Sequence, residues 1–120
     1  MDKTFLLLGA IAAFLAVAFG AFGAHGLRGR LSPEMMAVFE SAVRYHMYHA
    51  LALLLVGLIL GRMDGWLIRT AGWCFVAGII LFSGSLYALA LSGVTMLGAI
   101  TPVGGLAFLA GWACLAFAAV

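Results

Sequence analysis

The sequence predicts an all-α integral membrane protein: a four-helix bundle with a short amphipathic helical segment between spans one and two. Hydrophobic residues make up 67% of the 120 residues and charged residues only 8%, whereas soluble domains usually contain about a quarter charged residues. The stretch from Thr70 to Val120 has no Asp, Glu, Lys, Arg or His. It is much longer than the roughly 20 residues of one helical span, so it must fold back on itself.

Four spans are predicted, at residues 4–24, 45–61, 66–91 and 102–120, within a single transmembrane domain 1–120. The first is interpreted as a retained span, because its uncharged run from Thr4 to Ala24 exceeds the roughly 7–15 residues of a signal-peptide core. The last turn is expected between Ser92 and Pro102, where glycines interrupt the helical pattern and proline suits the start of a new helix.

The amphipathic segment is expected to begin at Ser32. Ser32 is a suitable N-cap, Pro33 fits the first helical position, and Glu34 complements the helix dipole. Glu40 and Arg44 follow at i,i+4 in the favourable acid-first order. We expect an interfacial helix that leads into span two.

Membrane orientation is nearly balanced in the sequence. Four spans place both termini on one side, with Lys3, Arg62 and Arg69 there and Arg28, Arg30 and Arg44 opposite. The free amine, together with pairing of Arg44 by Glu40, favours cytoplasmic termini. The few basic residues form no patch, so no nucleic-acid partner is expected.

Small residues recur at four-residue spacing in spans one, three and four. Such rows let membrane helices approach closely, and they predict a compact bundle. The rows are Ala12, Ala16 and Gly20; Gly84, Ala88 and Ser92; and Ala110, Cys114 and Ala118.

Four motifs extend along almost the whole chain: AFGAHGL (21–27), YHMYHALALL (45–54), LFSGSLYALALSG (81–93) and ITPVGGLAFLAGW (100–112). In this order they resemble a small bacterial inner-membrane family of unknown function, the one that includes YgdD and YwdK, and a eukaryotic group of small transmembrane proteins is similar. The resemblance implies four transmembrane helices and a multi-pass location in the bacterial plasma membrane. It implies no activity, substrate or cofactor.

Three histidines and two tyrosines are the first candidate site. His46 and His49 are about 60° apart on a helix, so both can point into one groove, and His25 lies on the same membrane side. Three neutral imidazoles there could hold zinc, copper or haem iron. The favoured interpretation is a hydrogen-bonding collar formed with Tyr45 and Tyr48, and a proton relay is a third alternative.

Further polar candidates lie on either side of that collar. Ser83, Ser85 and Tyr87 are expected either to line a small polar pocket with Thr101 or to form interhelical hydrogen bonds, which is the favoured alternative. Glu40 and Arg44 are candidates for an ion pair at a cavity mouth, although such a pair more often solubilises a helix face.

The favoured function is non-catalytic: a small integral membrane protein that packs with itself, with lipid or with a larger membrane complex. No cofactor is expected. The first alternative is a channel or transporter for a small solute or proton, and the second is a His-ligated metal or haem protein.

Overall fold

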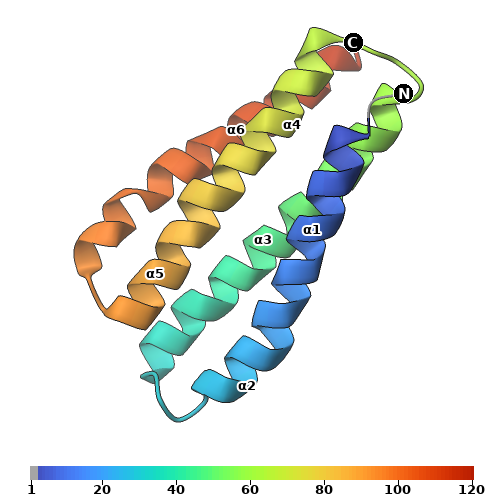
Figure 1. Ribbon diagram of the computed structural model, residues 1–120. Coiled ribbons are helices and arrows are strands. Elements are labelled where there is room, and N and C mark those ends of the chain that lie inside the picture. The colour runs from blue at the N-terminus through green and yellow to red at the C-terminus, as the bar shows by residue number, and fades with distance from the viewer. Residues whose placement is uncertain (1–2) are drawn as a thin grey trace.

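A computed structural model describes residues 3–120 and contains four long helical spans in this part of the chain (Figure 1). Span one consists of α1 (Thr4–Ala18), a π-helical turn η1 (Phe19–Gly23) and α2 (Ala24–Leu27). Span two is the single helix α3 (Pro33–Leu60). Span three consists of α4 (Trp66–Gly78), a second π-helical turn η2 (Ile79–Ser83) and α5 (Gly84–Ser92). A short 3₁₀ turn η3 (Thr95–Ala99) precedes α6 (Thr101–Ala118), the last span.

The amphipathic segment is continuous with span two. Ser32 is the N-cap, as predicted, and its side chain accepts a hydrogen bond from the Met35 N–H (3.1 Å), with Pro33 in the first turn. The helix then runs without a break to Leu60. Its 28 residues extend about 42 Å, which exceeds the roughly 30 Å hydrocarbon core. The first turns of α3 therefore reach the headgroup level, where Glu34 and Glu40 are exposed.

The four spans form two antiparallel hairpins. Span one packs along α3 and span three packs along α6, while α3 also packs against span three and joins the hairpins. The bundle is elongated and flat, with extents of 47 × 26 × 17 Å. The start of α1 and the end of α6 lie at the same end of the molecule (Figure 1). The predicted final turn is confirmed: Gly93 has a left-handed φ of 75° and ends α5.

Glycines set the closest helix contacts. A Cβ on Gly104 of α6 would lie 2.2 Å from the Phe82 nitrogen of η2, and a Cβ on Gly9 of α1 would lie 2.9 Å from the Leu54 nitrogen of α3. Both hairpins therefore depend on backbone-to-backbone approach, the usual means of helix packing in lipid. The apolar core comprises Phe5, Ala52, Leu53, Val56, Ile68, Ala71, Phe75 and Phe108.

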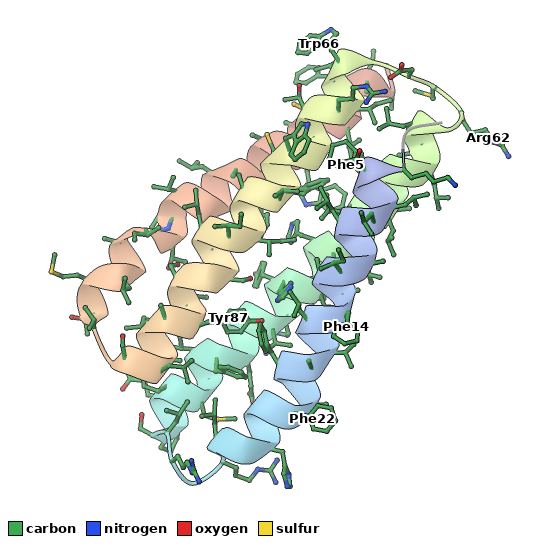
Figure 2. All side chains as sticks on the ribbon, viewed as in Figure 1. Phe5, Phe14, Phe22, Arg62, Trp66 and Tyr87 are labelled. Carbon is green, nitrogen blue, oxygen red and sulfur yellow. The ribbon has the colours of Figure 1, made fainter. Side chains whose placement is uncertain are left out.

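The outer helices keep large apolar faces. The spans Thr4–Leu27 and Thr95–Ala118 are far less buried than the two central spans. Phe14 and Phe22 point away from the bundle (Figure 2) and are 73% and 79% exposed. Because residues 3–120 leave these faces uncovered, they suit contact with lipid or with another membrane protein.

Candidate functional site

His46 is buried between α3, span one and α5. Its Nδ1 lies 2.9 Å from the Tyr87 hydroxyl, and its ring centroid lies 6.2 Å from that of Phe19 in span one. The Phe19 ring of η1 lies edge-on to Tyr87, with centroids 5.1 Å apart. The imidazole therefore joins α3 to span three through a hydrogen bond and contacts span one through an aromatic ring.

His49 is buried against α6. The Trp112 indole N–H donates to its Nε2 (3.1 Å), and its Nδ1 lies 2.8 Å from the Tyr45 carbonyl. A carbonyl only accepts and an indole N–H only donates, so the ring is the neutral tautomer with its proton on Nδ1. Its face stacks on Phe108 at a centroid distance of 3.5 Å and an interplanar angle of 9°. Both nitrogens and one face are thus occupied within the fold.

The structure separates the two histidines, which the spacing had placed in one groove. The two side chains differ by about 60° around the axis of α3. This difference is enough to separate them, because α3 has span one on one side and span three with α6 on the other. His25, in α2, is exposed. Among residues 3–120, no group of three His, Cys, Asp or Glu side chains is placed to hold a metal ion. The three-imidazole site proposed from the sequence is therefore not assembled.

Tyr45 and Tyr48 lie on the outer side of α3, where they are 40% and 54% exposed. Their rings meet edge-on at 5.8 Å, and the Tyr45 ring also packs on Phe82 of η2 at 4.8 Å. The predicted collar is therefore divided: its histidines point inward and its tyrosines cover the outside of the helix.

The side chains of Ser83 and Ser85 in span three each form a hydrogen bond to another helix. The buried Ser83 Oγ donates to the Ala42 carbonyl of α3 (2.8 Å). Ser85 Oγ donates to the Phe82 carbonyl (2.9 Å) and lies 2.6 Å from Thr101 Oγ1 at the start of α6. Because a hydroxyl has one proton, Thr101 is the donor of that second bond. The Ser83–Ala42 and Ser85–Thr101 bonds join different helices, whereas the Ser85–Phe82 bond lies within span three. The serines thus form separate hydrogen bonds and not one shared polar pocket.

Glu40 and Arg44 are exposed on α3. Arg44 donates from Nη2 to Ser41 Oγ (3.0 Å), and within the described residues it forms no ion pair with Glu40. The candidate ion pair at a cavity mouth is therefore absent from this part of the chain, and both side chains lie on an exposed helix face, the interpretation favoured from the sequence. A salt bridge instead joins Arg69 and Asp64 at the opposite end of the bundle (3.1 Å).

Sequence reasoning did not identify Trp112 and Phe108 as partners of His49. Their spacing of four residues places both on one face of α6, which was the available signal. Across residues 3–120, no buried side-chain nitrogen or oxygen lacks a hydrogen-bond partner. The candidate site is thus a set of satisfied contacts that fix how four helices meet.

The four apolar helices and their internally paired polar residues define a multi-pass integral membrane protein. The family model described as "Protein of unknown function (DUF423)" matches residues 19–105, and the chain belongs to this family. It is 50% identical to UPF0382 membrane protein YwdK of Bacillus subtilis over 119 residues, which cover 98% of this chain and 97% of the relative.

Two staphylococcal proteins are equally similar. UPF0382 membrane protein SH2409 of Staphylococcus haemolyticus is 51% identical (94% of this chain, 92% of the relative), and UPF0382 membrane protein SERP0230 of Staphylococcus epidermidis is 52% identical (97% and 94%). No solved structure matches the chain. The resemblance found in the sequence motifs is therefore confirmed, and the family's function is unknown.

Proposed function

We propose that the protein is a non-catalytic helical module that acts by packing against other membrane components, either further copies of itself or a larger membrane complex. The observation that carries this proposal is the pairing of the polar groups. His46, His49 and Ser83 are each bonded to a neighbouring element of the same chain. Because they are already occupied, the surface left for interaction is the apolar exterior.

The outer face of α6 is the best surface for protein contact. Ala110, Ala113 and Ala116 are exposed there, and small side chains let a second helix approach closely. Larger exposed side chains such as Leu106, Leu109 and Phe117 flank these alanines on α6. The exposed side chains of α1 are mostly large, including Phe14 and Phe22, and suit lipid better. We therefore place the protein–protein contact on α6.

Disulfide cross-linking in membranes tests this assignment. The free cysteines Cys74 and Cys114 are first replaced by alanine, and single cysteines are then introduced as Ala113→Cys on α6 and, as a control of similar depth, Ala10→Cys on the exposed side of α1. The proposal expects an intermolecular disulfide, with this chain or another membrane protein, for Ala113→Cys only. A cross-linking yield for Ala113→Cys no higher than for Ala10→Cys would contradict it.

We propose a bacterial plasma-membrane location with cytoplasmic termini. The location is supported by the motif resemblance. The orientation is carried over from the sequence prediction without the support of an Arg44–Glu40 pair, because Arg44 bonds to Ser41 instead. Fusions of green fluorescent protein and of alkaline phosphatase to the carboxyl end test the orientation. Fluorescence without phosphatase activity supports it, and the reverse result contradicts it.

The transporter alternative requires polar groups that a solute or proton can reach. Both nitrogens of His49 are bonded within the fold, and the buried Ser83 hydroxyl is committed to a backbone carbonyl. Measurement of proton flux into proteoliposomes separates the two functions. Flux above that of empty liposomes, abolished by His49→Phe, would favour transport over packing.

A further inference from the structure

A lateral window lies between the first and third spans, with an aromatic contact at each end. At one end Phe5 meets Trp73 edge-on, with centroids 5.1 Å apart and an interplanar angle of 66°. At the other end Phe19 meets Tyr87 in the same manner, at 5.1 Å and 72°. Figure 2 shows Phe5 between α1 and α4, and Tyr87 between α5 and α1. Phe5 and Phe19 are 14 residues apart on span one, and Trp73 and Tyr87 are also 14 residues apart on span three. The two contacts are therefore separated by roughly 20 Å.

Between these contacts the window is a cavity of about 400 Å³ with an aliphatic lining. α1 forms one wall, span three forms the other, and α3 forms the floor. The only hydrogen-bonding side chains in the lining, His46 and Tyr87, are bonded to each other. The aliphatic lining includes Leu8, Ile11, Leu15, Leu53, Ile79 and Ile80.

The depth of the window decides what can fill it. Span one has 24 residues and is about 36 Å long, so its middle lies inside the roughly 30 Å hydrocarbon layer. The window occupies residues 5–19 of this span and therefore opens onto lipid chains. An α-helix with its side chains is about 10–12 Å wide and would run along the whole span, so the aromatic contacts at both ends exclude it. A single flexible hydrocarbon chain can enter from the side.

We propose that the lateral window binds one acyl chain of a bilayer lipid. The chain lies along Ile11 and Leu15 on one wall and Ile80 on the other, above the His46–Tyr87 pair. This lipid site goes beyond the protein contact proposed for α6 and does not require it. The two ideas can fail separately, because the window is lined by α1, α3 and span three only.

Photolabelling in proteoliposomes tests the site. The probe is phosphatidylglycerol with a diazirine midway along one acyl chain, and the adducts are mapped by peptide mass spectrometry. Ile80 in the window is 64% exposed and Phe14, at similar depth on the lipid-facing side of α1, is 73% exposed, so bulk lipid alone labels Phe14 at least as readily as Ile80. The proposal expects several-fold more adducts at Ile80. Equal labelling, or a protein–protein cross-link at Ile80, would overturn it.

Filling the window provides the second readout. A Cβ on Gly84 meets only the Ile79 carbonyl oxygen, at 3.9 Å, so Gly84→Leu extends into the window without a backbone clash. Gly105→Leu is the matched control, because a Cβ there also has ordinary contacts, the nearest at 3.8 Å, but lies on α6 outside the window. The excess labelling of Ile80 should disappear in Gly84→Leu and persist in Gly105→Leu.

A second variant, Ala12→Leu, fills the window from its opposite wall. It provides the same readout if Gly84→Leu does not fold. Far-UV circular dichroism and a single elution peak identify the variants that fold. Loss of the excess labelling in a folded filling variant supports the site. Excess labelling that persists in a folded filling variant, or that falls equally in Gly105→Leu, would overturn it.

Discussion

The adjacent glycines Gly104 and Gly105 should respond oppositely to the same substitution. A Cβ on Gly104 would lie 2.2 Å from the Phe82 nitrogen and 2.7 Å from the Leu81 carbonyl carbon, whereas ordinary contacts begin at 3.4 Å. The obstacle is backbone, so α6 must move away from η2 by about an ångström. A Cβ on Gly105 meets only the edge of the Phe82 ring, at 3.8 Å.

The comparison isolates this packing cost. Gly→Ala gains up to about 1 kcal/mol of helix propensity at both positions, so the gain cancels between the variants. The remaining difference is overpacking, which typically costs about 1–3 kcal/mol. We therefore expect Gly104→Ala to have a free energy of unfolding about 1–3 kcal/mol below that of Gly105→Ala. The difference should lie towards the upper end of this range, because backbone atoms of η2 cannot rotate out of the way as a side chain can.

Reversible unfolding in mixed micelles of dodecylmaltoside and SDS, followed by far-UV circular dichroism, measures the difference. Gly105→Ala should match or slightly exceed the wild-type protein. Equal midpoints for the two variants, or a lower midpoint for Gly105→Ala, would refute the register of α6 against η2.

Three further predictions concern polar side chains. Ser83→Ala removes the bond to the Ala42 carbonyl and should cost about 0.6 kcal/mol, the average for such bonds in membrane proteins; an unchanged unfolding midpoint would argue against that bond. A double-mutant cycle of His49→Phe with Trp112→Phe keeps an aromatic ring at both positions. The two substitutions should show a coupling free energy of about 0.6–1.7 kcal/mol in unfolding. Additive effects would mean that the 3.1 Å contact is not formed. Arg44→Ala should leave stability within about 0.5 kcal/mol, because its guanidinium is exposed; a larger loss in the same unfolding assay would show a buried role.

The sequence was sufficient for the fold because its signals were local. The charge-free stretch after Arg69 required a turn, and Gly93 with Pro102 located it. The cap at Ser32 was equally local, since it depends on residues within one helical turn. The local pattern did not reveal that α3 is one unbroken helix from Pro33 to Leu60. The change from polar to apolar residues suggested two segments, although no helix-breaking signal lies between them.

The candidate site was harder to predict because it depends on which helices are neighbours. The types of the polar residues were recognised, but the partners of His46 and His49 lie on different spans, 41 and 63 positions along the chain. A spacing of three residues cannot distinguish one shared groove from two. The π-helical turn at η2, which shifts Ser83 and Tyr87 around the helix axis, also has no sequence rule as simple as a cap.

The central claim is that the protein is a module whose polar groups are bonded internally and which acts by packing. Native mass spectrometry of the protein released from membranes, without prior purification in detergent, tests this claim most directly. The account predicts masses equal to two or more copies of the chain, or to the chain with a stoichiometric protein partner, with lipid retained. A protein that appears alone as a single copy, or one with a metal or haem mass that is lost in His49→Ala, would contradict it.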